Sequence, residues 1–203
     1  MTAALVSIAA GYLLGSLPFG YWAGRLRGID LRTYGSGNTG ATNTMRVLGL
    51  KVGVPVMALD IAKGATAVVV ARLLAGGDVV PVLAAGAAVA GHLYPLFLGF
   101  RGGKGAATGA GAMVALVPWI GLAAFVLWLS VSLATRYVSI GSVVTAIAFP
   151  ATTFASGQPW PVRLFTLGAG AFVIWRHRPN IARLRAGTEH RINLRAVRAG
   201  RAS

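Results

Sequence analysis

The stretch TAALVSIAAGYLLGSLPFGYWAG, residues 2–24, decides the fold class, because it is long, apolar and free of charged side chains. About 20 such residues are enough for a helix to cross the hydrocarbon core of a bilayer. No basic residue precedes it, so it lacks the positively charged front of a cleavable signal peptide. The stretch therefore predicts a first membrane span that the protein keeps.

The composition of the whole chain supports this prediction. Of its 203 residues, 56% are hydrophobic and only 11% are charged, whereas a soluble domain carries about 25% charged residues. The absence of cysteine excludes disulfides, thiolate metal sites and cysteine nucleophiles. The net charge of +15 indicates cytoplasmic loops and anionic lipid headgroups rather than nucleic acid. We expect one membrane domain over residues 1–203, with no metal and no cofactor.

Five further apolar segments follow, and one is too long for a single span. As one helix, residues 105–135 would extend roughly 46 Å, against a hydrocarbon core of about 30 Å. We therefore predict a break at Val117-Pro118-Trp119. The fold class is all-α: a polytopic membrane protein with about seven short transmembrane helices, or five if some segments are merged or re-entrant. The other apolar segments are residues 52–75, 79–100 and 137–156, and a last segment that ends near Trp175.

Basic residues give the orientation of these spans. Sixteen of the 19 Lys and Arg residues fall on the side of the membrane that the chain reaches at the end of the first span. Because cytoplasmic loops carry an excess of Lys and Arg, we predict the N-terminus outside and the C-terminus in the cytoplasm, with a basic tail from about residue 176. Outer turns are predicted at Gly76-Gly77-Asp78 and at residues 157–161. No internal repeat is visible, which argues against an inverted-repeat transporter.

A polar, glycine-rich run, GSGNTGATN at residues 35–43, follows the first span and is itself followed by Arg46. Glycines permit a positive-φ backbone that turns N–H groups inward, and hydroxyl and amide side chains add donors. Several fixed dipoles can then converge on a phosphate. We predict an anion cradle in this first motif, with a flexible loop as the alternative. The residues expected to act are Gly35, Ser36, Gly37, Asn38, Thr42, Asn43 and Arg46.

A second motif, RGGKG at residues 101–105, lies where the third span meets the fourth. Arg101 and Lys104 supply charge, and the amides of Gly102 and Gly103 are expected to point from a helix N-terminus toward an anion. The motif is not a Walker A loop, because Gly105 stands where Ser or Thr must follow the lysine. The alternative is a pair of basic membrane anchors in a tight turn.

A third motif runs from His177 to Glu189, after the last span. His177 can exchange a proton near neutral pH, and Asn180 can orient a hydroxyl group. Glu189 is the only acid of the tail. We expect it to hold an arginine rather than to take part in the chemistry.

Two charges inside the second span also require an explanation. Asp60 and Lys63 are three residues apart, so on a helix they share a face and can neutralise one another. We expect them to hold helices together, and the alternative is a supporting role near the site. His92 is predicted to be a hydrogen-bonded packing histidine near the same site.

Together and in this order, the three motifs resemble those of the bacterial acyl-phosphate:glycerol-3-phosphate acyltransferases. Residues 35–46 resemble the family's first motif, residues 102–108 its second and residues 177–189 its third, so the resemblance covers most of the chain. It implies a multi-pass enzyme of the bacterial cell membrane with its active site facing the cytoplasm. The implied substrates are acyl phosphate and glycerol 3-phosphate. Transfer to the 1-hydroxyl would give lysophosphatidic acid and inorganic phosphate, the first acylation of phospholipid synthesis, with no obligate protein partner.

The mechanism is constrained by a motif that is missing. The other large class of glycerolipid acyltransferases uses a histidine followed five residues later by aspartate. The positions five residues after His92, His177 and His190 hold Phe97, Ala182 and Arg195. We therefore expect direct attack on the acyl phosphate, driven by positioning and by cations that stabilise the leaving phosphate.

Within this mechanism, we assign Ser36, Arg46 and Lys104 to the acyl phosphate, and His177 and Asn180 to glycerol 3-phosphate. The general base is either His177 or the phosphate of the substrate itself. The competing mechanism makes Ser36 a nucleophile that forms an acyl-enzyme intermediate. Outside the acyltransferases, the alternatives are an organic-anion transporter and a membrane scaffold protein.

Overall fold

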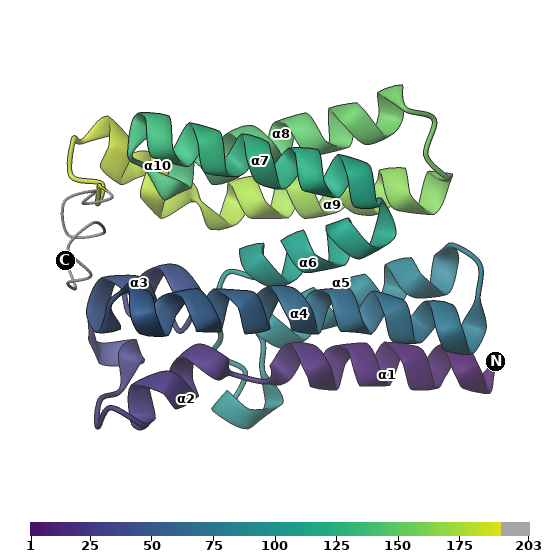
Figure 1. Ribbon diagram of the computed structural model, residues 1–203, viewed down its shortest axis with the longest axis horizontal. Coiled ribbons are helices and arrows are strands. Elements are labelled where there is room, and N and C mark those ends of the chain that lie inside the picture. Colours follow the sequence, from purple (N-terminus) through teal and green to yellow (C-terminus); the bar gives the residue numbers. More distant parts are fainter. Residues whose placement is uncertain (192–203) are drawn as a thin grey trace.

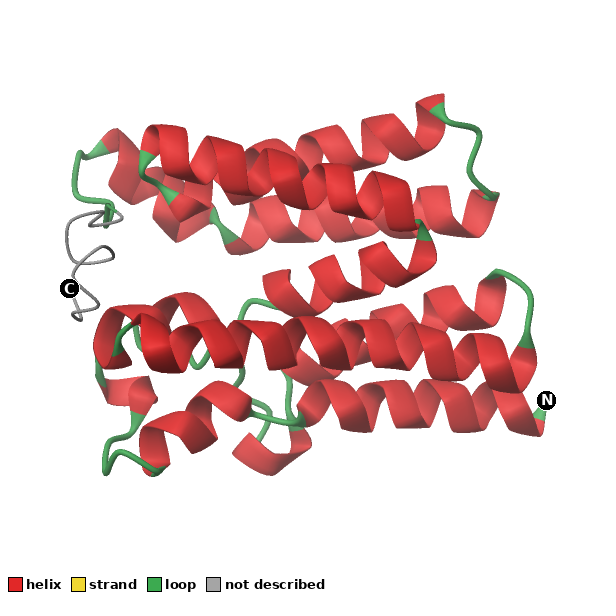
Figure 2. Cartoon of the chain, in the orientation of Figure 1, coloured by secondary structure: helices red, strands yellow, loops and turns green. Residues whose placement is uncertain are grey.

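The computed structural model describes residues 1–191, which form helices and connecting loops without a strand in that range (Figures 1 and 2). The predicted all-α class is confirmed. The rest of the predicted basic tail, residues 192–203, lies outside the described residues. The α-helices are α1 (Thr2–Ser16), α2 (Phe19–Arg25), α3 (Ala41–Leu48), α4 (Leu50–Ala75), α5 (Val79–Leu93), α6 (Ala106–Leu116), α7 (Pro118–Thr135), α8 (Val138–Ala155), α9 (Trp160–Arg176) and α10 (Arg178–Arg185). Two 3-10 turns are η1 (Leu31–Thr33) and η2 (Leu96–Leu98).

The helices form two layers with α6 between them (Figure 1). One layer contains α1, α4 and α5, with α2 and α3 at one end, and the other contains α7, α8 and α9. A buried apolar cluster joins the layers, because its members come from α4 and α5 of one layer, from α8 and α9 of the other, and from α6 between them. They include Val68, Ala85, Ala112, Phe149 and Val162.

The two ends of the molecule differ in what they carry. The N-terminus, the turn at residues 76–78 and the turn between α8 and α9 lie at one end (Figure 1). Helices α2, α3 and α10 lie at the opposite end. The predicted turns are therefore on the side away from the first and third motifs. Which end faces the cytoplasm stays a prediction.

Five helical segments of the described chain are long and apolar enough to cross a membrane: residues 2–25, 50–75, 79–98, 118–135 and 138–155. The break predicted at Val117 is confirmed, since α6 ends at Leu116 and α7 begins with Pro118 in its first turn. The apolar helix α6 has 11 residues and α9 has 17. The count of seven spans therefore stays a prediction.

The helix is interrupted within two of the predicted spans, at a proline in each case. The first is interrupted at Leu17 and Pro18, which separate α1 from α2. In the third, α5 ends at Leu93, and the 3-10 turn η2 continues the segment to Leu98. Proline lacks an N–H and disfavours the helical conformation of the residue before it. Tyr94, just before Pro95, accordingly leaves the helical region with φ −126° and ψ 64°.

Helix α7 shows how the outer surface suits a membrane. Its exposed apolar side chains recur every three or four residues, so they form one stripe along the helix. In a bilayer this stripe would face the acyl chains. Its members are Leu122, Val126, Leu129 and Leu133.

Candidate functional site

The first motif folds as a loop that is organised by a single side chain. Asn43, at 2% exposure in α3, donates through Nδ2 to the carbonyls of Tyr34 (3.0 Å) and Asn38 (2.9 Å). Its Oδ1 accepts the N–H of Ser36 at 2.9 Å. The backbone turns at Gly35 and Gly37, which take φ values of +60° and +69°. The run is therefore a built loop rather than a featureless linker.

The structure corrects the predicted use of this loop's amides. The N–H groups of Ser36, Gly37 and Gly40 donate to Asn43 Oδ1, Tyr34 O and Asn38 Oδ1, so they do not form an open cradle. Only two of the three glycines have positive φ, since Gly40 is at −81°. The amide cradle is wrong for these three groups. The side chains of Ser36 and Thr42 are both exposed and remain candidates for anion binding.

The second motif runs back along the end of α5. Gly102 N–H donates to Leu93 O at 3.0 Å, and Gly103 N–H donates to His92 O at 3.1 Å. The expectation that these two amides face an anion is wrong for the same reason as in the first motif. The next residue, Lys104, projects its charge toward the third motif.

A continuous chain of polar contacts joins the second motif to the third. Lys104 Nζ donates to Asn180 Oδ1 at 2.6 Å, and Asn180 Nδ2 donates to Glu189 Oε1 at 2.7 Å. Glu189 Oε2 accepts Arg183 Nε at 2.7 Å. The predicted contact of Glu189 with an arginine is therefore present. Residues more than 70 positions apart are fixed to one another by these contacts.

Cations outnumber anions in this cluster, which we define as Arg46, Lys104, Asn180, Arg183 and Glu189. Burial lowers the pKa of the Lys104 ammonium, and the nearby Arg183, Arg176 and Arg46 lower it further, against the opposing charge of Glu189. Arg46 NH1 also reaches Asn43 Oδ1 at 3.4 Å. Arg46 thus contacts the first motif, and its charge lies close enough to Lys104 to act on that ammonium.

Glu189 holds its charge in this setting. Burial alone would raise the pKa of its carboxyl, but hydrogen bonds from Asn180 and Arg183 lower it below the usual range. One carboxylate thus faces several cations. The unbalanced positive charge gives the cluster the capacity to bind an anion such as a phosphate.

His177 is placed as a neutral hydrogen-bond acceptor. Its ring is 6% exposed, and Nδ1 lies 2.8 Å from Val173 O, which requires the proton on Nδ1. Burial lowers the pKa of His177, and Lys104 and Arg176 lower it further. The neutral tautomer leaves a lone pair on Nε2. That nitrogen could orient a hydroxyl group or take its proton.

A cleft of about 550 Å³ brings the first and second motifs together. It is mixed in character, because cationic side chains share it with Leu93, Tyr94 and Phe100. Its polar lining is Asp30, Arg32, Thr33, Gly37, Thr39, Arg101, Gly102 and Arg176. Within residues 1–191, no group of three or more His, Asp or Glu side chains is placed to hold a metal ion.

Sequence reasoning missed two arginines of this region. Arg176 lines the cleft and donates to Gly103 O at 3.2 Å, and Arg32 lines the cleft while paired with Asp30 at 2.6 Å. Both lie among the basic residues that follow membrane spans. Nothing in the sequence distinguished them from ordinary membrane anchors.

With this geometry in place, known proteins give the family. The chain matches the glycerol-3-phosphate acyltransferase family over residues 5–187. This protein belongs to the glycerol-3-phosphate acyltransferase family. The acyltransferase is 46% identical to the glycerol-3-phosphate acyltransferase of Rubrobacter xylanophilus, over 95% of this chain and 97% of that one. It is 47% identical to glycerol-3-phosphate acyltransferase 2 of Moorella thermoacetica, over 95% and 99% of the two chains.

Solved structures extend the likeness to three dimensions. The acyltransferase matches a crystal structure of PlsY, an integral membrane glycerol 3-phosphate acyltransferase, in its glycerol 3-phosphate form. The TM-score is 0.91 at 44% identity, over 96% of this chain and 98% of that one. The lysophosphatidic acid form gives 0.87 at 43%, over 94% and 95%. The predicted family resemblance and the membrane class are confirmed. The individual roles of the site residues in the acyltransferase stay predictions.

Proposed function

We propose that this family member transfers a fatty acyl group from acyl phosphate to the 1-hydroxyl of glycerol 3-phosphate. The observation that carries the proposal is that three cations, Arg46, Lys104 and Arg183, lie near one carboxylate, Glu189. Arg183 contacts this carboxylate directly, Lys104 is joined to it through Asn180, and Arg46 is close enough to sense its charge. Both proposed substrates carry phosphate and phosphate is the leaving group, so the reaction needs more positive than negative charge. The charge balance of the cluster supports this reaction.

The chemistry needs no activated enzyme nucleophile, because acyl phosphate is a mixed anhydride. The hydroxyl oxygen of glycerol 3-phosphate attacks the carbonyl carbon and forms the ester bond. The bond from that carbon to the phosphate oxygen breaks, and phosphate leaves with its electron pair. The proton of the hydroxyl passes to a base. Fixed cations at the leaving phosphate then lower the barrier without reorganisation.

The contact between Lys104 and Asn180 refines the assignment of the two substrates. We place Lys104, Arg46 and Ser36 at the acyl phosphate, and Asn180 and His177 at glycerol 3-phosphate. Since Lys104 Nζ and Asn180 Oδ1 are 2.6 Å apart, the two phosphate-bearing substrates would meet at this pair. Binding them side by side is what direct transfer requires.

The same geometry supports His177 as one of two candidate bases. Its Nε2 is the unprotonated nitrogen when Nδ1–H is held by Val173 O. A positioned base typically contributes about 10²- to 10⁴-fold. The phosphate of glycerol 3-phosphate is the other candidate, and a substrate base would leave His177 an orienting role.

The proposal also places the enzyme in the bacterial cell membrane with its site on the cytoplasmic side. The basic residues support this orientation, because the end with α2, α3 and α10 carries most of them. A fatty acyl donor can reach such a site from the bilayer, while glycerol 3-phosphate comes from water.

The test is a comparison of acyl donors. Purified protein in lipid vesicles is given glycerol 3-phosphate with acyl phosphate, acyl-coenzyme A or acyl carrier protein bearing the same chain. We expect lysophosphatidic acid from acyl phosphate at a rate at least about tenfold above the thioesters. Faster formation from either thioester would refute the proposed donor.

A further inference from the structure

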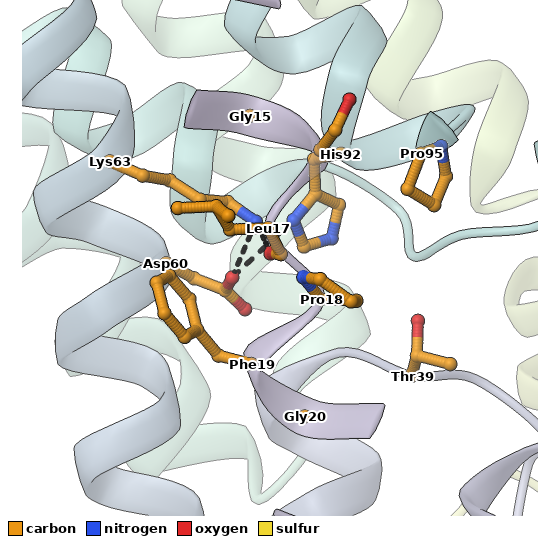
Figure 3. Close-up of a pocket in the computed structure, with 11 residues that line it drawn as sticks. Gly15, Leu17, Pro18, Phe19, Gly20, Thr39, Asp60, Lys63, His92 and Pro95 are labelled. Carbon is orange, nitrogen blue, oxygen red and sulfur yellow. Dashed lines mark hydrogen bonds and ion pairs between the residues drawn. The ribbon is translucent and has the colours of Figure 1, made fainter. Parts of the chain in front are cut away.

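A buried ionic network lies between α4 and the second motif. Asp60 and Lys63 of α4 are only 2% and 4% exposed, and Asp60 Oδ1 lies 2.8 Å from Lys63 Nζ (Figure 3). Burying two charges in a membrane protein is costly even when they are paired. A plain packing contact between helices would not need charges. The partners of this pair show what they are used for.

On one side, the pair closes the break between α1 and α2. The chain leaves the helical conformation at Leu17, with φ −62° and ψ 115°, so the Leu17 carbonyl has no partner within α1. Lys63 Nζ donates to Leu17 O at 2.9 Å (Figure 3). The ammonium thus serves both Asp60 and the end of α1.

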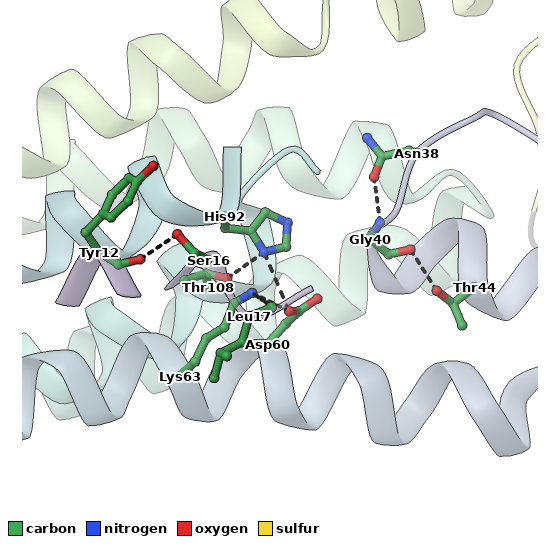
Figure 4. Close-up of polar contacts among 10 residues, drawn as sticks. All are labelled: Tyr12, Ser16, Leu17, Asn38, Gly40, Thr44, Asp60, Lys63, His92 and Thr108. Atoms are coloured by element: carbon green, nitrogen blue, oxygen red, sulfur yellow. Dashed lines mark hydrogen bonds and ion pairs between the residues drawn. The ribbon is translucent and has the colours of Figure 1, made fainter. Parts of the chain in front are cut away.

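On the other side, the pair reaches His92 at the end of α5. His92 Nδ1 lies 3.0 Å from Thr108 Oγ1 and 3.5 Å from Asp60 Oδ1 (Figure 4). These two contacts, from α4 and α6, fix the plane and position of the imidazole. His92 is 8% exposed and Thr108 is fully buried.

The fixed imidazole in turn supports the second motif. Gly103 lies close to Nε2 of the ring, so that a Cβ at this position would collide with this nitrogen. A Cβ at Gly102 would collide with the His92 carbonyl oxygen. The backbone hydrogen bonds from Gly102 to Leu93 and from Gly103 to His92 hold this same loop segment against the end of α5. The residue that follows is Lys104, whose ammonium meets Asn180.

We infer that Asp60, Lys63 and His92 are positioning residues, which hold the second motif so that Lys104 reaches the third. The inference rests on the proposed function for its kinetic consequence. It also explains the glycines of the second motif, which are needed for contact with His92 rather than for approach to an anion. The network acts through the backbone of Gly102 and Gly103 and touches no substrate.

The natural absence of cysteine allows a direct test of this placement. Lys104→Cys introduces a single thiol, and its rate of modification by 2-aminoethyl methanethiosulfonate is followed by mass spectrometry on the full chain. We expect adding His92→Leu to change this rate by about tenfold or more, because the loop loses its support. Thr108→Val, which removes only the hydroxyl that faces Nδ1, should change the rate in the same direction.

The matched control is Thr153→Val, which breaks the buried Thr153–Thr166 hydroxyl contact of 2.8 Å between α8 and α9. It should leave the modification rate within about twofold, since it loses a comparable hydrogen bond away from the loop. Equal rates in the network variants and in the control would overturn the inference. Thr108→Val keeps the test decisive if the His92 variant fails to fold.

Kinetics give a second arm. His92→Leu should lower kcat by about 10- to 100-fold in the natural chain, as expected for a misplaced catalytic group. In a Lys104→Ala background, His92→Leu should lower kcat by less than about threefold, because the ammonium that His92 helps to position is already gone. If the fold-losses in kcat from His92→Leu and Lys104→Ala instead multiply in the double variant, the positioning role is overturned. If the natural chain makes no product from acyl phosphate, the proposed function fails, while the thiol rates still decide the placement.

Discussion

Replacing Lys104 with alanine should separate activity from stability. The ammonium lies at the junction of the second and third motifs, 2.6 Å from Asn180 Oδ1, and is the proposed partner of the leaving phosphate. Loss of one preorganised donor to a developing negative charge typically costs about 2.7–4 kcal/mol in the transition state. We therefore expect kcat to fall by about 10²- to 10³-fold.

The folded protein should tolerate this change well. The lost hydrogen bond is worth about 1 kcal/mol. Against this, burial and the neighbouring Arg183, Arg176 and Arg46 lower the pKa of Lys104, so the fold holds the charged form less well than the unfolded chain does. These terms oppose each other. The free energy of unfolding should change by no more than about 1 kcal/mol.

The assay measures lysophosphatidic acid formation together with the thermal midpoint in the same detergent. Lys51→Ala is the matched control, because it removes an exposed ammonium and should leave both quantities unchanged. A Lys104→Ala protein with full turnover would refute the catalytic assignment. A variant that is inactive because its thermal midpoint has collapsed would refute the argument about opposing terms.

Three further predictions concern separate parts of the structure. Asn43→Ala should lower the thermal midpoint and abolish activity together, because it leaves backbone groups of the loop without hydrogen-bond partners, at about 1–3 kcal/mol each. If Asn43 only bound substrate, the substitution would weaken substrate affinity and leave the thermal midpoint unchanged. Arg72→Gln should destabilise the protein by about 1.5–3 kcal/mol without changing KM, since Arg72 donates to the last carbonyls of α6 at Ala115 (2.7 Å) and Leu116 (2.8 Å). Because burial lowers the pKa of folded His177, the stability it contributes is present above its unfolded pKa of about 6.5 and is lost as pH falls through the lower folded value. His177→Gln should remove that acid-side loss from a profile of thermal midpoint against pH, and an unchanged profile would contradict the neutral state assigned to His177 in the fold.

The helices that the sequence predicted well are those for which length and hydropathy suffice. The spans at 118–135 and 138–155 begin and end within two residues of their predicted limits. Pro118 was a reliable signal, because proline suits the first turn of a helix. In contrast, the prediction of an apolar segment over residues 79–100 took no account of Pro95, which ends α5 at Leu93.

The candidate site was predictable in its residue types and not in its backbone. Glycine and asparagine indicated turns, and the structure has them at Gly35 and Gly37. The direction of each N–H, however, depends on which acceptor the folded loop offers. Asn43 Oδ1 accepts the N–H of Ser36, and the carbonyl of His92 accepts the N–H of Gly103. Both contacts depend on packing that no local sequence pattern encodes.

The long-range contacts were the least predictable part. The pairing of Asp60 with Lys63 follows from helical spacing, and it is present. The reach of that pair to Leu17 and His92 depends on how three helices pack. Sequence spacing carries information within one helix, whereas contacts between helices depend on packing of small residues along their interfaces.

The central claim is that one cation-lined site holds both phosphate-bearing substrates at once, so that the acyl group passes directly between them. The most direct measurement is the initial rate of lysophosphatidic acid formation, with acyl phosphate and glycerol 3-phosphate varied independently. Direct transfer predicts double-reciprocal lines that intersect, because both substrates must be bound together. Parallel lines, with acyl-enzyme trapped on Ser36 in the absence of glycerol 3-phosphate, would contradict it.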